Sequence, residues 1–113
     1  TSSCGWNLSS DGRLKEDVQD LALGLSFIEK VQPRTFSWKH TPNYPVTGFI
    51  AQEVAAVQEE CDAEILRLVD TSNPDSYTLA TTGFIPPMIN AIKELSAQIK
   101  ELRAELDELK SKQ

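Results

Sequence analysis

The clearest pattern of apolar and polar positions lies in the last third of the chain. Between residues 85 and 109 an apolar residue recurs every three or four positions without a break, and most positions between them are charged, polar or small. This spacing predicts one continuous helix with a narrow apolar seam, arranged as heptads. Position a is occupied by Ile85, Ile92, Ile99 and Leu106, and position d by Met88, Leu95, Leu102 and Leu109.

The seam favours self-association over packing of the helix on its own domain. Apart from positions a and d, residues 101–112 (ELRAELDELKSK) are too charged to lie in a monomeric core. Glu105 at position g and Lys110 at position e would attract each other across a parallel pair of helices. The heptads leave the number of helices open, because Ile at a with Leu at d favours two strands, whereas Leu106 and Met88 depart from that rule.

Shorter patterns upstream predict a helix followed by a strand. Helical spacing joins four apolar residues ahead of the helix-ending Pro33: Val18, Leu21, Leu25 and Ile28. Gly24 weakens the middle of the segment, so two short helices are the alternative to one. Residues 34–39 (RTFSWK) alternate and include β-branched and aromatic side chains, which predicts a strand. Residues 40–48, with two prolines, are expected to form a loop.

Further segments complete the picture before the long helix. A second helix is predicted after an extended entry at Phe49, from the helical spacing of Ile50, Val54 and Val57. Residues 63–71 predict one or two strands, residues 73–76 a turn and residues 76–82 a short strand. We therefore expect an α+β fold, in which a small mixed domain of short strands and helices ends in a long, self-associating C-terminal helix.

Composition narrows the range of functions. The chain has 113 residues, which suit one small domain, and a formal net charge of −6. Such an acidic surface argues against nucleic acid or a membrane as the main partner, and no run reaches the ~18 apolar residues of a membrane span. A lone His40 without a His/Cys cluster argues against a metal site and a Ser-His-Asp triad, and we expect neither a cofactor nor a small-molecule ligand. Cys4 and Cys61 are expected as thiols in a reducing compartment, with a disulfide between them as the alternative.

The segment SDGRLK, which begins at Ser10, admits two interpretations. Ser10, Asp11 and Lys15 are ordinary residues for a capped, solvated first turn of a helix. Alternatively, Ser10 is a nucleophile and Lys15 its base, because a separation of five residues lets the two side chains converge if the chain turns at the Asp-Gly step. A lysine acts as a base only when its amine is neutral, which burial or a cationic neighbour such as Arg13 favours.

Several motifs in a fixed order resemble a known family. Residues 10–18 (SDGRLKEDV) resemble the opening motif of the intramolecular chaperone auto-processing domains at the C-terminal ends of phage tailspikes, tail fibres and endosialidases. Residues 23–39 (LGLSFIEKVQPRTFSWK) are similar to the helix, proline and aromatic strand of that family, and residues 48–54 (GFIAQEV) to one of its hallmarks. With the C-terminal helix, the resemblance covers residues 9–113. The myelin regulatory factor family contains the same type of domain.

This resemblance implies a function and a set of site residues. It implies a self-cleaving serine endopeptidase in which Ser10 is the nucleophile and Lys15 its general base, with Asp11 and Arg13 in supporting roles. It also implies a homotrimer that brings an upstream β-rich stalk of the same polypeptide into register before releasing itself. The domain is then expected in the host cytoplasm during virion assembly and absent from the mature fibre.

The same resemblance divides the chain into three parts. Residues 1–9 are expected to be a remnant of the upstream stalk, residues 10–83 the chaperone and auto-processing core, and residues 84–113 a trimeric coiled-coil helix. Within GFIAQEV, we expect a structural role, with the apolar side chains in the core and the polar ones on the helix surface: Phe49, Ile50 and Val54 inside, Gln52 and Glu53 outside.

Two peptide bonds are candidates for the cut. Attack of the Ser10 hydroxyl on the preceding carbonyl passes through a five-membered ring and cuts Ser9–Ser10. The family resemblance favours Ser10–Asp11 instead, although attack of the hydroxyl on its own carbonyl is strained and needs another route or a neighbouring subunit. Two other functions stay open, namely a non-catalytic trimerisation or capping module with the same fold, and an auto-processing segment of a membrane-released transcription factor.

Overall fold

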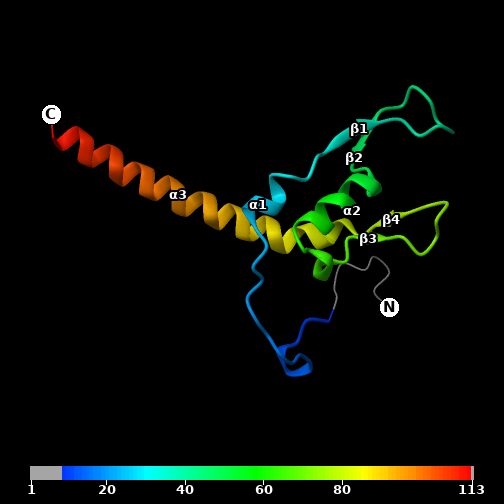
Figure 1. The fold of residues 1–113 in the computed structure, drawn as a ribbon, viewed down its shortest axis with the longest axis horizontal. Helices are drawn as coiled ribbons and strands as arrows, with labels where there is room; N and C mark the ends of the chain where they lie inside the picture. The colour runs from blue at the N-terminus through cyan, green and yellow to red at the C-terminus, as the bar shows by residue number, and fades with distance from the viewer. Residues whose placement is uncertain (1–8, 113) are drawn as a thin grey trace.

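The fold is organised around one long helix, α3 (Ile85–Ser111), which carries the rest of the domain on its N-terminal half (Figure 1). The computed structural model describes residues 9–112, so the predictions for Cys4 and for the stalk remnant up to residue 8 lie outside the described residues. α3 contains 27 residues. The predicted long C-terminal helix and the mixed helix-and-strand class are therefore confirmed.

The start of α3 follows from its sequence. A 3₁₀ turn, η3 (Thr81–Phe84), leads into the helix, and Pro86 and Pro87 stand in the first turn. Proline suits this position because the first N–H groups of a helix have no partner within it. Phe84, at the junction, is buried and stacks on Phe49 with ring centroids 4.8 Å apart. This contact ties the start of the long helix to the core.

The core lies between the first half of α3 and two shorter helices. These are α1 (Leu25–Ile28), which packs against α3, and α2 (Ala51–Glu60), which is followed by the 3₁₀ turn η2 (Glu64–Leu66). The central cluster of buried apolar side chains is small and comes from α1, α2, the segment around η2 and the end of η3: Phe27, Val54, Ala63, Leu68 and Phe84. Such a small core gives the single chain limited burial on which to rely.

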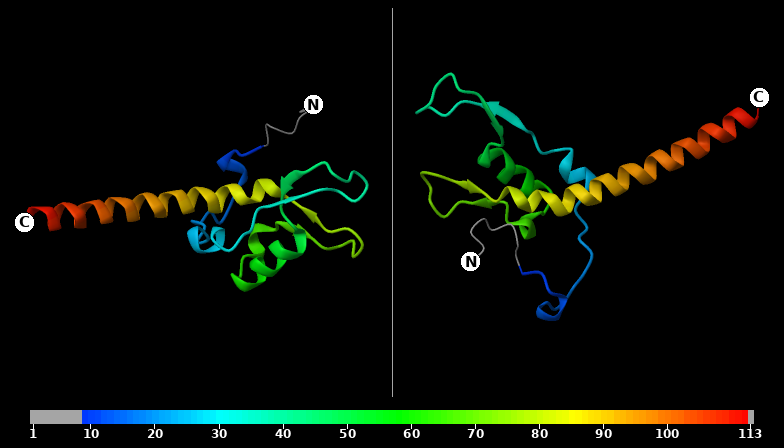
Figure 2. Two further views of the ribbon diagram at one scale, coloured as in Figure 1. Left: turned by 90° about the horizontal axis from the view of Figure 1, so that it is seen from above. Right: turned by 180° about the vertical axis from the view of Figure 1, so that it is seen from behind.

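Two short antiparallel hairpins project from this core, away from the C-terminal end of α3 (Figure 2). In the first, β1 (Arg34–Phe36) pairs with β2 (Val46–Gly48), with Phe36 opposite Val46. In the second, β3 (Val69–Asp70) pairs with β4 (Thr78–Leu79), with Val69 opposite Leu79. The strand predicted at residues 34–39 is confirmed in its first half, and the predicted turn at residues 73–76 connects β3 to β4.

Three predictions of local structure are wrong in part. The helical spacing from Val18 to Ile28 produces only the four residues of α1, because residues 18–24 form no regular secondary structure and Val18 faces solvent. The predicted loop at residues 40–48 contains β2, which finds its partner in β1. Residues 63–71 form η2 and only a two-residue strand, because Arg67 adopts a left-handed conformation with φ of 48° between them.

The single chain is far more open than a compact protein of the same mass. Its accessible surface is 9609 Å² and its Cα radius of gyration 19.2 Å. A compact monomer of 12.6 kDa would have ~6,200 Å² and ~13 Å. The a and d side chains of α3 contribute to the excess, since they are between 44% and 64% exposed. Packing of this seam on the chain's own domain is therefore ruled out, and self-association stays a prediction.

Candidate active site

The segment from Ser10 to Lys15 is shaped by a short capped turn. Its centre is the 3₁₀ turn η1 (Gly12–Leu14), and the Asp11 side chain caps it by accepting a hydrogen bond from the backbone N–H of Arg13 at 2.9 Å. The Leu14 N–H donates to the Asp11 carbonyl oxygen at 3.0 Å, which closes the turn. Sequence predicted both the turn and the cap, because Asp is a preferred capping residue and Gly follows it.

This turn brings the two predicted catalytic side chains together. Lys15 Nζ donates a hydrogen bond to Ser10 Oγ at 2.8 Å, across a separation of five residues. That distance lies within the range in which a base takes a proton from a hydroxyl. The catalytic roles of Ser10 and Lys15 stay a prediction, but the contact that such a dyad requires is present within one chain.

Asp11 and Arg13 bind each other rather than the dyad. The Arg13 guanidinium donates to both carboxylate oxygens of Asp11, with Nη2–Oδ2 at 2.6 Å and Nε–Oδ1 at 3.1 Å. The Arg13 side chain is the main reason that the pKa of Asp11 lies below its usual range. Asp11 therefore remains ionised throughout the neutral range, and the forked pair supports the turn on which Ser10 and Lys15 stand.

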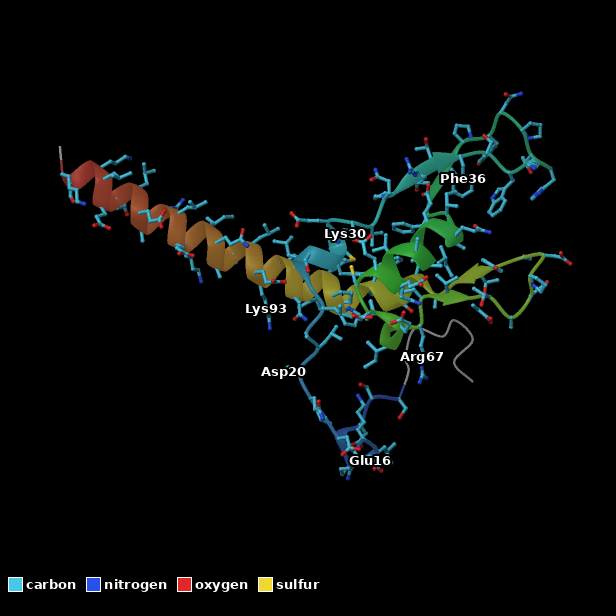
Figure 3. The ribbon with its side chains drawn as sticks, viewed as in Figure 1. Glu16, Asp20, Lys30, Phe36, Arg67 and Lys93 are labelled. Carbon is cyan, nitrogen blue, oxygen red and sulfur yellow. The ribbon has the colours of Figure 1, made fainter. Side chains whose placement is uncertain are left out.

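The candidate site is open to water. Every residue from Ser9 to Asp20 is exposed, and the segment stands away from the helices and hairpins, with Glu16 near its far end (Figure 3). Two apolar side chains close to the dyad are among the most exposed of the chain, Leu14 at 78% and Val18 at 79%. Exposed apolar groups beside a candidate dyad indicate a surface that gains stability when another surface covers it.

The residues of GFIAQEV have structural contacts. Val54 is buried and Phe49 half-buried against Phe84, as predicted, but Ile50 lies at the surface. Glu53 binds Arg34 at the start of β1 through two hydrogen bonds of 3.0 Å, which ties α2 to the first hairpin. Arg34 is the largest cause of the lowered pKa of Glu53.

Two further observations concern metal ligands and membrane spans in the part of the chain that the structure describes. Among residues 9–112, no group of three His, Cys, Asp or Glu side chains lies close enough together to hold a metal ion. Within the same range, no helix is both long and apolar enough to cross a membrane. Cys61 is a half-buried free thiol.

A comparison with protein families adds an independent observation to this geometry. Residues 10–63 match the family model for the chaperone of endosialidase. This family also carries a peptidase name, peptidase S74. The match spans just under half of the chain and confirms the family resemblance predicted from the sequence. No curated protein and no solved structure matches the chain.

The segment that matches the family model begins at Ser10, contains Lys15 and ends at Ala63, shortly after α2. It therefore includes the whole candidate dyad, whereas the second hairpin and α3 follow it. The segment contacts α3 through polar side chains that sequence reasoning missed, Asn90 and Glu94. Both occupy outward positions of the heptad pattern, so no pattern marked them out.

Proposed function

We propose that this chain is an intramolecular chaperone that trimerises, aligns an upstream β-rich stalk of the same polypeptide and then releases itself by autoproteolysis. The observation that carries the proposal is the 2.8 Å contact between Lys15 Nζ and Ser10 Oγ inside the segment that matches the chaperone family. Neither feature is sufficient alone, because exposed Ser–Lys contacts are common and the family match assigns no roles to residues.

The proposed chemistry is an acyl shift followed by hydrolysis. The Lys15 amine takes the proton of the Ser10 hydroxyl, and Oγ attacks the carbonyl carbon of Ser9. The C–N bond between Ser9 and Ser10 then breaks as the Ser10 nitrogen receives a proton from the Lys15 ammonium, which leaves an ester. Water opens this ester, so that Ser9 ends with a carboxylate and Ser10 with a free amine and its original hydroxyl. A cut at Ser10–Asp11 is the second candidate and is distinguished by the fragment masses.

The proposed active form is the trimer rather than the single chain. A lysine amine is a base only when neutral, and exclusion of water favours the neutral form. In the single chain the dyad is exposed, and so are Leu14 and Val18 beside it. Burial of these apolar side chains against a neighbouring subunit would supply the dry surroundings, while the seam of α3 supplies the association.

In the proposed function, cleavage after assembly makes the assembly of the stalk irreversible. Pairing strands of three chains is slow, because the chains must be in register before long-range contacts form. A local coiled coil at the end of the chain brings the three stalks together first. After the cut, the stalk cannot return by the same route, and its lifetime depends on its unfolding rate. We place these events in the host cytoplasm during virion assembly, with the released domain absent from the mature fibre.

The test is intact mass spectrometry of the protein carrying upstream stalk sequence, alongside Ser10→Ala and Lys15→Ala. The parent should split at Ser10, and both variants should stay whole. The matched controls are Ser26→Ala and Lys93→Ala, which remove an exposed hydroxyl and an exposed amine elsewhere. They should split like the parent.

Three results would overturn the proposal or part of it. A parent that folds and stays whole has no autoproteolytic activity, and what remains is a trimerisation or capping module. A parent and a Lys15→Ala variant that split equally fast exclude Lys15 as the base. Light scattering on the same samples measures the number of chains, and a monomer or dimer would exclude the proposed trimer.

A further inference from the structure

The chain that leads away from the dyad is attached to α3 by three hydrogen bonds. Asn90 Nδ2 donates to the carbonyl oxygens of Leu21 and Leu23, both at 2.9 Å. Glu94 Oε2 accepts a hydrogen bond from the backbone N–H of Leu25 at 2.7 Å. We call these two side chains with residues 21–25 the linker clamp.

The linker clamp explains the missing helix before α1. The backbone groups at Leu21, Leu23 and Leu25 have partners on α3, so residues 21–23 can stay extended without leaving these groups unpaired. Gly24 permits this close approach, because a Cβ atom there would lie 3.0 Å from Asn90 Cβ and would overlap the Glu94 carboxylate. The glycine that weakens a helical pattern in the sequence is thus the contact point with another helix.

The clamp and the seam lie on opposite faces of the same turns of α3. Asn90 and Glu94 occupy heptad positions f and c, whereas the seam uses positions a and d. The turns that contain Ile92 and Leu95 therefore carry both the surface for self-association and the attachment of the linker. Formation of a coiled coil through the seam leaves the clamp accessible to the chain's own residues 21–25.

The clamp is the described anchor nearest to Lys15 on its C-terminal side. Residues 15–20 are all exposed, and the chain from Lys15 to Leu21 spans at most ~20 Å. The distance that the dyad can move from α3 is therefore limited by residues 15–21 and by the place where the linker clamp holds them. A tether held at α3 confines the dyad to a small volume beside the helix bundle, and confinement raises the effective concentration of reacting groups.

We infer that Asn90 and Glu94 are positioning residues for self-cleavage, which hold the linker on α3 so that helix assembly delivers the dyad to the neighbouring subunit. This inference rests on the proposed function. Neither side chain touches Ser10 or Lys15 in the inferred role, and both act through the backbone of residues 21–25.

The experiment measures the first-order rate of self-cleavage in the stalk-carrying protein after replacement of Glu94. Glu94→Ala removes the acceptor for the Leu25 N–H, whereas Glu94→Gln keeps an acceptor oxygen. Glu101→Ala is the matched control, because Glu101 occupies the same heptad position one heptad later and is exposed. Asn90→Ala tests the second side chain of the clamp independently.

Glu94→Ala removes one hydrogen bond and should slow cleavage about five- to tenfold. Asn90→Ala removes two and should slow cleavage at least as much. Glu94→Gln should recover most of the parental rate, and Glu101→Ala should retain all of it. Light scattering should show the same number of chains in every variant. Hydrogen exchange of the Leu25 amide should accelerate in Glu94→Ala and stay slow in Glu94→Gln, which reports the clamp itself.

Three results would overturn the inference. One is parental cleavage in Glu94→Ala while the Leu25 amide exchanges fast, because the clamp is then broken without consequence. Another is slow cleavage together with loss of the oligomer, because a structural role then explains the rate. A parent that never cleaves overturns the proposed function and this inference with it, and that failure is visible before any variant is compared.

Discussion

Replacement of Ile99 by Ala tests whether the seam of α3 is buried between chains. Ile99 is 59% exposed in the single chain. If it stays exposed, the change should alter stability by no more than about 0.5 kcal/mol, and with a stabilising sign, because Ala has the higher helix propensity. Full burial of such a side chain contributes about 1.5–3 kcal/mol to stability. If a coiled coil buries the part of Ile99 that is exposed in the single chain, Ile99→Ala loses that share, and the cavity left behind adds to the loss.

The buried case therefore predicts a loss of about 1–4 kcal/mol per chain. In a trimer the substitution occurs three times, so assembly should weaken by about 3–12 kcal/mol, at least two orders of magnitude in the dissociation constant. The sign of the change in stability alone therefore distinguishes an exposed Ile99 from a buried one.

The assay combines thermal melting at several protein concentrations with sedimentation equilibrium. The melting temperature of the parent should rise with concentration, because association stabilises the folded chains by mass action. Ile99→Ala should melt at a lower temperature and dissociate at a higher concentration, whereas Glu101→Ala should behave like the parent. An unchanged or raised melting temperature in Ile99→Ala, together with a parent that melts independently of concentration, would refute a buried seam.

Two further predictions concern the domain itself. Arg34 lowers the pKa of Glu53, so this ion pair should add stability above the ordinary Glu range near pH ~4.3 and lose it as the pH falls through the lowered pKa. The melting temperature of Glu53→Gln should accordingly be lower than that of the parent at pH 7 and equal to it under strong acid. A difference in melting temperature that widens in acid would contradict the ion pair. Gly83→Ala should cost about 1–3 kcal/mol, because a Cβ there would lie 2.7 Å from Leu68 Cδ2. Leu68→Ala alone should cost about 2–5 kcal/mol. In the double variant, chemical denaturation should show a loss of stability smaller than the sum of the two, since the cavity left by Leu68→Ala accepts the new methyl group. Strictly additive losses would refute the contact.

The sequence predicted those features that depend on near neighbours in the chain. The long helix follows from an unbroken heptad pattern, and the turn at Asp11 follows from the capping preference of Asp before Gly. The contact between Ser10 and Lys15 is of the same kind, because a tight turn over five residues suffices to bring the side chains together. Such features need no knowledge of the rest of the fold.

Features that depend on distant partners were not predictable in this way. β2 pairs with β1 across a loop that contains two prolines, and its three residues carry too short a pattern to be recognised. The helical spacing before Gly24 was misleading, because that backbone is held in a non-helical conformation by hydrogen bonds donated by Asn90 and accepted by Glu94. The openness of the dyad was equally hidden, since Leu14 and Val18 beside it have the apolar character of core residues and yet are exposed.

The two opposite faces of α3 also fix an angle. Each residue turns the helix by about 100°, so the direction in which the domain is carried is locked in phase with the coiled-coil seam. An inserted residue between Glu94 and Ile99 would turn the distal seam by that angle relative to the linker clamp, whereas an inserted heptad would nearly restore it. In the proposed coiled coil, the length of α3 would therefore vary in steps of seven residues while each domain keeps nearly the same orientation around the common axis of the helices.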